Sequence, residues 1–302
     1  MVTKKPMKGN TRVTGKEQFY TPLEVASSVV QKVLKLVPGS IDRPWLEPCA
    51  GSGNFLLAIR REGVRTVIGF DLHPASPEIK QQDFFSFTTT ETDFVTATNP
   101  PFGRNNALSI PFFNHASSFS SVIAFIVPRS WRKWSVQNRL NRHFHLISDD
   151  DLSINYVDAL GKPISDASLL RTCLQVWVKK RRLRPIVAVE DRGLIRKVSP
   201  QEADIALTIF GRGCGQLSST FDRGKKVTTQ MYLKLTHPDA LTALQTANFG
   251  KYFNRVAYTE ALSILEVRAS LNQVLFGDEL LYDGKDEPGL FEEEELIPFG
   301  QD

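Results

Sequence analysis

The sequence has few cysteines, no long apolar run and no internal repeat, and each absence excludes a class of protein. Its three cysteines, Cys49, Cys173 and Cys214, are far apart and form no CxxC pair, which argues against a disulfide framework or a cysteine zinc site. The longest strongly apolar run, residues 122–127, is far too short to cross a bilayer. No apolar segment of a secretory signal follows the basic first ten residues. We therefore expect a cytoplasmic protein with no membrane partner.

Charge is distributed unevenly along the 302 residues. The whole chain has 37 Lys+Arg and 33 Asp+Glu, a formal net charge of +4. Residues 278–302 contain 10 acidic residues and 1 basic residue, so the rest carries 36 basic and 23 acidic residues, a net charge of +13. A basic body followed by an acidic tail favours a polyanionic partner for the body, such as nucleic acid.

Strand and helix patterns alternate through the first 180 residues. The first helix is expected to have Thr21 as its N-cap and Pro22 at its first position, and to run to Pro38. Two further helices are expected over 54–61 and 132–143. Strands are expected over 43–47, 66–71, 94–98, 121–127 and 174–178. This alternation predicts an α/β fold with a doubly wound, Rossmann-like parallel sheet.

The charged run Lys179–Pro185 marks a domain boundary, because it has no periodicity and ends in proline. Beyond it we expect strands over 204–210 and 228–235 and helices over 239–245 and 260–276. This pattern predicts a smaller C-terminal α+β domain. The whole chain then divides into a flexible basic arm (1–16), the α/β domain (17–182), the C-terminal domain (183–277) and an acidic tail (278–302).

Three turns that carry chemistry follow predicted strands, and ligands bind at the carboxyl ends of such strands. The first, Glu47–Gly53, has glycines that allow a ligand close to the backbone at a helix N-terminus. It matches neither GxGxxG nor a P-loop, which favours a nucleotide-like ligand without a pyrophosphate. A plain glycine turn is an equal alternative for this spacing alone.

The other two turns supply hydrogen-bond acceptors. Asp71 ends its strand about 20 residues after the glycine turn, where an acid can hold ribose hydroxyls, or simply cap a helix. In Asn99-Pro100-Pro101-Phe102 the prolines make a rigid turn. An amide oxygen and a proline carbonyl there can accept from an exocyclic NH2 group, and the ring can stack on a base. The alternative is a proline turn with a core phenylalanine.

These motifs together resemble the S-adenosylmethionine-dependent N6-adenine DNA methyltransferases of the gamma class. The order is FYTP (19–22), EPCAGSG (47–53), Asp71, Asp83-Phe84 and NPPF (99–102). In that class the FYTP or FFTP element precedes the glycine motif, and a target-recognition region follows the catalytic domain. The resemblance covers roughly residues 16–180. It implies a methyltransferase domain over 17–182 and a substrate-recognition domain over 183–277.

The resemblance implies S-adenosylmethionine as cofactor, a nucleic-acid substrate and no metal. Asp71 is expected to hold the ribose hydroxyls, while Asp83 accepts from the cofactor's adenine and Phe84 packs on that ring. Asn99 and Pro100 are expected to hold the target amine. The catalytic set is Asn99, Pro100, Pro101 and Phe102. The cofactor set is Phe19, Tyr20, Thr21, Pro22, Glu47, Pro48, Ala50, Gly51, Gly53, Asn54, Phe55, Asp71, Asp83 and Phe84.

The sequence departs from the family at two aromatic positions. Many relatives have tyrosine where this chain has Phe102, which keeps stacking but lacks the hydroxyl. Relatives also supply a second aromatic side chain from a later loop, and residues 161–170 contain none. Tyr156, Trp131 or Trp134 could substitute, although each tryptophan could instead anchor an amphipathic helix, which is the favoured interpretation for Trp134.

Basic side chains outside the turns suit a phosphate backbone. We expect five of them to contact nucleic acid, although a solvated helix face is the alternative for about half: Arg104, Arg129, Arg132, Lys133 and Arg139. Three other functions remain open, namely N6-adenine methylation of RNA, methylation of a protein glutamine amide, and nucleic-acid binding without catalysis. The recognition sequence and the oligomeric state leave no signal in the sequence.

Overall fold

The computed structural model describes residues 19–158, 162, 170–223, 228–278 and 280–282. Within these, the chain forms two compact units. The first comprises residues 19–131 and 135–184, and the second comprises residues 132–134 and 185–282. The predicted basic arm (1–16) and all of the predicted acidic tail beyond residue 282 lie outside the described residues.

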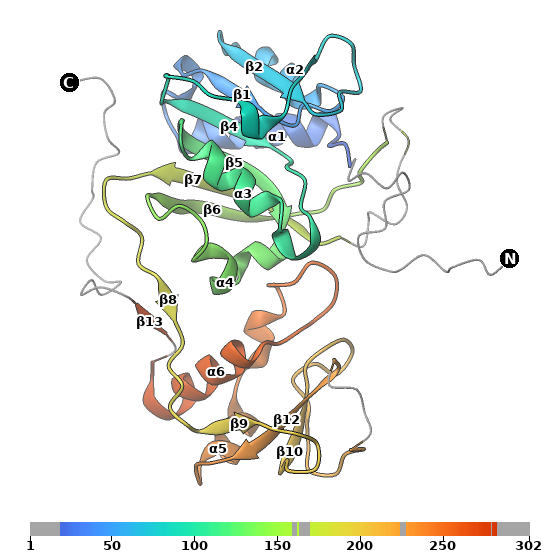
Figure 1. The fold of residues 1–302 in the computed structure, drawn as a ribbon, viewed down its shortest axis with the longest axis vertical. Helices are drawn as coiled ribbons and strands as arrows, with labels where there is room; N and C mark the ends of the chain where they lie inside the picture. The colour runs from blue at the N-terminus through green and yellow to red at the C-terminus, as the bar shows by residue number, and fades with distance from the viewer. Residues whose placement is uncertain (1–18, 159–161, 163–169, 224–227, 279, 283–302) are drawn as a thin grey trace, which may run out of the picture. The chain divides into compact units, whose positions relative to one another are not determined.

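The first unit is built on a seven-stranded sheet (Figure 1). Its strands are β1 (Trp45–Glu47), β2 (Val67–Asp71), β3 (Lys80–Gln81), β4 (Phe94–Thr98), β5 (Ser120–Pro128), β6 (Phe144–Leu152) and β7 (Thr172–Lys179). They lie in the order β3-β2-β1-β4-β5-β7-β6. The first five strands pair in parallel, whereas β7 is antiparallel to both β5 and β6. The predicted doubly wound α/β sheet is confirmed. Its order reverses between β1 and β4, the place where such sheets bind ligands.

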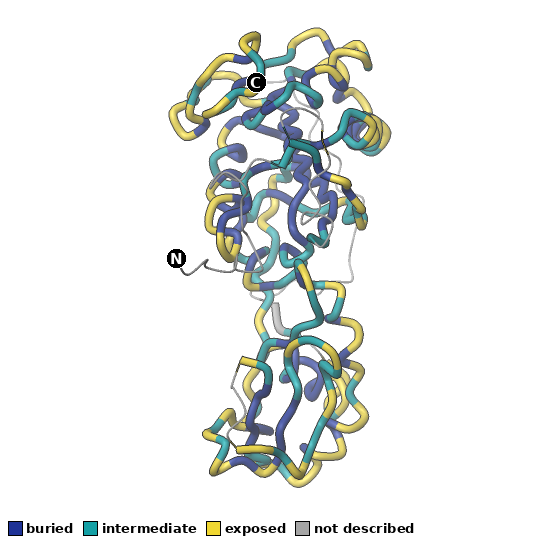
Figure 2. The backbone as a smooth tube through the Cα atoms, turned by 90° about the vertical axis from the view of Figure 1, so that its right-hand side faces the viewer, coloured by how far each residue is buried: buried dark blue, intermediate teal, exposed yellow. Residues whose placement is uncertain are grey.

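Helices cover both faces of this sheet. They are α1 (Leu23–Leu36), α2 (Asn54–Arg61), α3 (Ser109–Ala116) and the short α4 (Trp134–Gln137), with 3-10 turns η1 (Ser40–Asp42), η2 (Phe84–Ser86), η3 (Arg104–Asn106) and η4 (Arg129–Arg132). Alternate β5 residues enter two cores, Val122 among residues of α1 and α2, and Ile123 among those of α3. All of β5 is therefore buried, as Figure 2 shows for the central strands.

The second unit is a smaller α+β structure, as predicted. A four-stranded antiparallel sheet has the order β11 (Leu217–Ser218), β10 (Ile205–Thr208), β12 (Gln230–Leu235) and β9 (Ile195–Lys197). Helices α5 (Ala240–Thr246) and α6 (Ile264–Phe276) accompany it, together with η6 (Phe249–Tyr252). A two-stranded pair joins β8 (Val187–Ala188) and β13 (Leu281–Tyr282). No helix in the described part of either unit is long and apolar enough to span a bilayer.

Two predictions about helix ends were wrong. The first helix has Pro22 as its N-cap, because the N–H groups of Val25 and Ala26 both donate to the Pro22 carbonyl. The helix expected over 132–143 is reduced to α4. Past it the chain turns, because the Asn114 side chain donates to the Arg139 carbonyl at 2.9 Å and accepts from Asn141 N–H at 2.9 Å. Side-chain bonds of this kind compete with helix formation.

Candidate active site

The carboxyl ends of β1, β2 and β4 lie together at one edge of the sheet. In-register parallel pairing places Glu47 at the end of β1 beside Gly69 of β2. Leu46 of the same strand pairs with Thr96 of β4, so Asn99, which follows β4, lies at the same edge. Glu47, Asp71 and Asn99 therefore meet where the sequence predicted, although they are up to 52 residues apart in the chain.

Residues 19–22 are bound to this edge by two asparagine side chains. The Asn99 amide nitrogen donates to the Phe19 carbonyl at 3.0 Å, and the Asn54 amide nitrogen donates to the Thr21 carbonyl at 2.8 Å. Tyr20 also exchanges two backbone hydrogen bonds with Val157, at 3.0 and 3.1 Å. This segment thus connects the glycine turn, at Asn54, to the proline turn, at Asn99.

Gly51 is required by the Tyr20 ring. Its backbone is left-handed (φ 51°), and a Cβ atom there would lie 2.6 Å from Tyr20 Cε1, closer than any side chain tolerates. Gly53 is also left-handed (φ 88°) and is the N-cap of α2. The glycine turn is therefore shaped by its contact with residues 19–22 as well as by the start of the helix.

Asp71 holds the glycine turn from the second strand. One carboxylate oxygen accepts from Gly51 N–H at 2.8 Å, and the other accepts from His73 N–H at 2.7 Å. The carboxylate is partly exposed, and each oxygen keeps acceptor capacity for a further donor. Burial, with a smaller effect of the Asp71 charge, raises the pKa of Tyr20 above its usual value.

Glu47 is a fully buried carboxyl group beneath the glycine turn. Its Oε1 accepts from Cys49 N–H at 2.8 Å and from the Thr98 hydroxyl at 2.5 Å. Burial raises the pKa of Glu47 to about 8, despite the opposing effect of these two hydrogen bonds. Burial and the neighbouring Glu47 also raise the pKa of Cys49, so its thiol stays protonated and is unsuited to be a nucleophile.

Three buried oxygens in this cluster lack a hydrogen-bond partner among the described residues. They are Thr21 Oγ1, Glu47 Oε2 and Asn99 Oδ1, one from each of the three motifs that meet here. An unsatisfied buried polar group costs about 1–3 kcal/mol. Their convergence marks the place where a polar ligand could supply missing hydrogen-bond partners.

The Asn99-Pro100-Pro101-Phe102 turn continues into a tightly constrained loop. Phe102 is only 7% exposed. Gly103 is left-handed, and a Cβ atom there would lie 2.8 Å from Leu108 N. Asn105 and Asn106 also have positive φ, 55° and 62°, and the Asn106 amide donates to the Ser130 hydroxyl at 3.2 Å. Sparsely populated backbone of this kind clusters at functional sites.

The remaining predicted cofactor residues occupy different environments. Asp83 is exposed on the same edge, and its carboxylate accepts from Phe85 N–H at 3.0 Å. Phe84 is 2% exposed, with ring centroids 4.8 Å from Phe112, whereas Phe85 is 46% exposed. Phe55 is buried in the core under α2, and Pro48 and Ala50 are also buried. The ring that is open to a ligand near Asp83 is therefore that of Phe85.

The three aromatic side chains considered as a second base clamp are buried. Trp131 and Tyr156 are 0% exposed and Trp134 is 9% exposed. The Trp131 indole donates to the Ser109 hydroxyl at 3.1 Å, and Trp134 packs against Tyr252. All three rings are thus core residues. Most of the stretch 161–170 lies outside the described residues.

The predicted phosphate contacts divide into two groups. Arg129 pairs with Asp151 at 2.9 Å, Lys133 pairs with Glu266 at 3.5 Å, and Arg132 donates to the Asn254 carbonyl at 3.3 Å. Arg104 and Arg139 are exposed and form no ion pair with another described residue. Of the five predicted phosphate contacts, only these two present a charge without an ion-pair or hydrogen-bond partner among the described residues.

Sequence reasoning did not single out Thr98 or Phe85. Thr98 donates the 2.5 Å hydrogen bond to Glu47, and Phe85 is the exposed ring beside Asp83. The signal for Thr98 was available, since a hydroxyl immediately before Asn99 in a buried strand needs a partner. For metal ions, the described residues contain no group of three His, Cys, Asp or Glu side chains that could hold one.

No family model and no curated protein matches the chain. Solved structures resemble it weakly. A Pyrococcus horikoshii protein with a provisional RNA-methyltransferase assignment aligns at 18% identity over 56% of this chain and 90% of its own, with a TM-score of 0.44. A type I restriction-modification methyltransferase subunit from Streptococcus thermophilus aligns at 18% identity over 60% and 49%, with a TM-score of 0.40.

The type I restriction enzyme EcoKI M protein is a third such structure, at 16% identity over 54% of this chain and 44% of its own, with a TM-score of 0.40. The chain thus spans about half the length, or less, of the two restriction subunits. All three identities are below 25% and all three TM-scores are below 0.5. No activity or residue role is transferred from these proteins.

Proposed function

We propose that this chain transfers a methyl group from S-adenosylmethionine to the exocyclic N6 amine of adenine in DNA. The observation that carries the proposal is the orientation of the Asn99 amide. Its nitrogen is committed to the Phe19 carbonyl, while its oxygen is buried with no partner among the described residues. The side chain therefore offers its unpaired carbonyl oxygen as an acceptor to a ligand beside the proline turn.

The residues around Asn99 fit the proposed cofactor. Asp71 retains acceptor capacity for ribose hydroxyls, and Asp83 with the exposed Phe85 ring would border the adenine. Tyr20 and Thr21, packed on the glycine turn, would line the methionine side. When bound, S-adenosylmethionine supplies an electrophilic methyl group.

The chain's own contribution is mostly positioning. The Asn99 oxygen and the Pro100 carbonyl accept from the two hydrogens of the target amine, which directs its lone pair toward the methyl donor. The consecutive prolines fix these acceptors in place, and correct orientation of two reactants can supply about 7–11 kcal/mol of barrier lowering. The proton that the amine loses on methylation can pass to solvent, so no side chain has to act as a strong base, in keeping with the raised pKa values of Glu47 and Cys49 nearby.

The target base has to leave its stack to reach this edge. Phe102 is the proposed stacking partner, and because only 7% of it is exposed, the adjacent residues 103–107 have to shift when a base enters. The left-handed Asn105 and Asn106 in that loop are already strained and can release strain in such a movement.

Nucleic-acid contacts are assigned to exposed groups. Arg104 and Arg139 are the proposed phosphate ligands beside the site, whereas Arg129 and Lys133 serve first as ion-pair partners within the fold. The second unit is the proposed recognition domain. It holds a cavity of about 400 Å³ lined mainly by hydroxyl and amide groups, which read base edges. Its lining includes Thr208, Gln216, Ser218, Thr220 and Gln230.

A methyl-transfer assay with tritiated S-adenosylmethionine tests the proposal. The wild-type chain is incubated with duplex DNA, single-stranded DNA, structured RNA and a protein extract, and labelled nucleosides are separated by chromatography. We expect label in N6-methyladenine from DNA. Label only in RNA assigns the same chemistry to the other nucleic acid, and label only in protein contradicts the proposal. A heat-denatured sample is the control for nonenzymatic transfer.

A further inference from the structure

A second cavity lies at the opposite edge of the seven-stranded sheet. It is lined by the α3–β5 turn (Ser117, Ser118), the segment before β6 (Asn141, His143) and the end of β7 (Lys179). These segments sit at the amino ends of β5 and β6, because Lys179 pairs with Phe144 at the start of β6. Along β5, the step from Ser120 to Phe125, level with Thr98, spans roughly 17 Å at about 3.3 Å per residue. This cavity is therefore separate from the candidate active site.

The lining of the cavity is basic and polar. Its volume is about 570 Å³, within the range of small-ligand sites. Lys179, Lys180 and Arg181 contribute three consecutive cations, and no acidic side chain is among the described residues that line it. None of the three forms an ion pair with another described residue. Three adjacent like charges repel one another, so an anion bound among them would be stabilised.

The backbone of this basic run is fixed while its side chains remain available. Lys180 N–H donates to the His143 carbonyl at 2.7 Å, and the His143 ring nitrogen Nδ1 donates to the Lys180 carbonyl at 3.1 Å. The adjoining Arg184 guanidinium donates to the Gln137 carbonyl at 2.7 Å. These bonds hold the segment against its neighbour without using the Lys179 or Lys180 amines.

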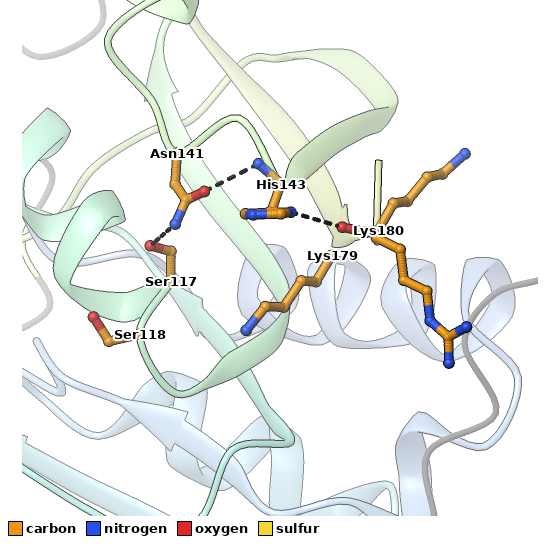
Figure 3. Close-up of a pocket in the computed structure, with 7 residues that line it drawn as sticks. Ser117, Ser118, Asn141, His143, Lys179 and Lys180 are labelled. Carbon is orange, nitrogen blue, oxygen red and sulfur yellow. Dashed lines mark hydrogen bonds between the residues drawn. The ribbon is translucent and has the colours of Figure 1, made fainter. Parts of the chain in front are cut away.

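Asn141 is positioned by its own hydrogen bonds. Its amide donates to the Ser117 hydroxyl at 2.9 Å and accepts from His143 N–H at 3.0 Å (Figure 3). This leaves His143 Nε2 and the exposed Ser118 hydroxyl as further polar groups at the cavity. Figure 3 shows Lys179 extending across the space beside these residues.

We propose that this cavity is a phosphate-binding site, formed by Lys179, Lys180 and Arg181 with the Ser118 hydroxyl. Phosphate oxygens accept several charge-assisted hydrogen bonds, which lysine, arginine and serine side chains provide. The phosphate can belong to a small ligand or to a nucleic-acid backbone that follows this edge. Phosphate binding here does not depend on methyl transfer. Either proposal can therefore be refuted without affecting the other.

Binding measurements on a charge-matched pair of triple variants test the site. The cavity variant is Lys179→Gln/Lys180→Gln/Arg181→Gln. The control is Lys35→Gln/Arg60→Gln/Arg61→Gln, which removes three exposed cations from α1 and α2 and lowers the net charge equally. Inorganic pyrophosphate is titrated by calorimetry, and a short fluorescent DNA duplex is titrated by anisotropy over a series of salt concentrations.

We expect the cavity variant alone to lose at least tenfold in pyrophosphate affinity, or to reduce the duplex salt slope by about 2–3. A loss in the pyrophosphate arm assigns a small phosphate ligand, and a loss in the duplex arm assigns the nucleic-acid backbone. Equal affinities and slopes for the two triple variants would overturn the site. If the cavity variant fails to fold, Arg181→Glu carries the same test, because that side chain is exposed.

Discussion

Three buried oxygens without a hydrogen-bond partner among the described residues distinguish the candidate site of the first unit. Thr21 Oγ1, Glu47 Oε2 and Asn99 Oδ1 are buried polar atoms that the described residues leave unsatisfied. At about 1–3 kcal/mol each, they are a considerable cost in a domain whose total stability is about 5–15 kcal/mol. A ligand that forms hydrogen bonds with these atoms would relieve the cost. The Asn99 oxygen bears most directly on catalysis, because its partner nitrogen is already bound to Phe19.

Replacing Asn99 with alanine separates catalysis from cofactor binding. We expect Asn99→Ala to lower kcat about 10²-fold or more, since it removes a positioned hydrogen-bonding group at the reacting amine. The dissociation constant for S-adenosylmethionine should change less than about threefold, because the glycine turn and Asp71 are untouched and residues 19–22 stay bound to Asn54 and Val157. Single-turnover kinetics and calorimetry measure the two quantities.

Asn54→Ala is the matched comparison. Its amide also donates to the 19–22 segment, at the Thr21 carbonyl, but on the proposed cofactor side. We expect this variant to weaken cofactor binding more than it lowers kcat. Undiminished transfer by Asn99→Ala would remove Asn99 from the mechanism.

Glu47 makes stability depend on pH in a predictable direction. Burial raises its pKa in the folded chain to about 8, against 4.5 in the unfolded chain. Between pH 4.5 and 8 the folded state therefore binds more protons than the unfolded state, so the free energy of unfolding falls as pH rises through this window. The full effect is at most about 5 kcal/mol.

Glu47→Gln should flatten this pH dependence. Glutamine keeps an oxygen to accept from Cys49 N–H and the Thr98 hydroxyl, but it carries no titrating proton. We expect the variant to be more stable than wild type at pH 8 by about 2 kcal/mol or more, with the gap closing toward pH 5. Urea unfolding at a series of pH values measures it, and parallel curves for the two proteins would refute the assignment to Glu47.

The elements that sequence patterns predicted best are those with strong local signals. Residues 54–61 and 94–98 form α2 and β4 with the predicted bounds, because a glycine turn or a buried apolar run defines each end. Strand β6 was missed. Its sequence FHLISDDDL places three acidic residues in a row, and it exists because eight of its nine residues pair with the antiparallel β7. Pairing with a partner distant in sequence leaves no local signal.

The candidate active site likewise contains residues that the sequence could predict and residues that depend on distant contacts. Glu47, Asp71 and Asn99 were predictable because they follow buried strands and meet by the rule of parallel sheets. The exposed Phe85, in place of Phe84, was not predictable, since the two rings are adjacent in sequence and packing against Phe70 and Phe119 decides which is buried. The ion pairs of Arg129 and Lys133 likewise join residues more than 20 positions apart.

The contact between the glycine turn and residues 19–22 can be tested with two glycines. Gly51→Ala adds a Cβ atom 2.6 Å from the Tyr20 ring, whereas Gly63→Ala meets nothing within 4 Å, and both positions have positive φ. Each substitution carries backbone strain of about 1–3 kcal/mol. Only Gly51→Ala should also displace Tyr20 and weaken S-adenosylmethionine binding, by at least about tenfold.

Thermal unfolding and calorimetry on both glycine variants provide the readout. The destabilisation of Gly63→Ala measures the backbone strain alone, and the excess in Gly51→Ala measures the displacement of the ring. Equal cofactor affinity in the two variants would show that the position of Tyr20 does not matter for binding.

On the scale of the whole molecule, charge is distributed unevenly between the end of the sequence and the rest of the chain. Residues 283–302 contain eight acidic residues and one basic residue, so the remainder of the chain has a net charge of +11. Asp278 does not behave as part of a separate tail, since Arg192 donates to its two carboxylate oxygens at 2.9 and 2.6 Å. Residues 281–282 form β13, which pairs with β8. A truncation that spares the second unit therefore begins at residue 283.

Removing residues 283–302 should strengthen binding to duplex DNA at low salt. The change in net charge from +4 to +11 increases long-range attraction to phosphate, and at 0.01 M salt the screening length is about 30 Å. We expect severalfold tighter binding at that salt, a steeper salt slope, and convergence with wild type near 0.2 M.

Replacing Glu292–Glu295 with glutamine raises the net charge by four and should give an intermediate effect if charge alone acts. Identical affinities for truncated and full-length chains at every salt concentration would mean that the acidic segment does not influence the nucleic-acid surface.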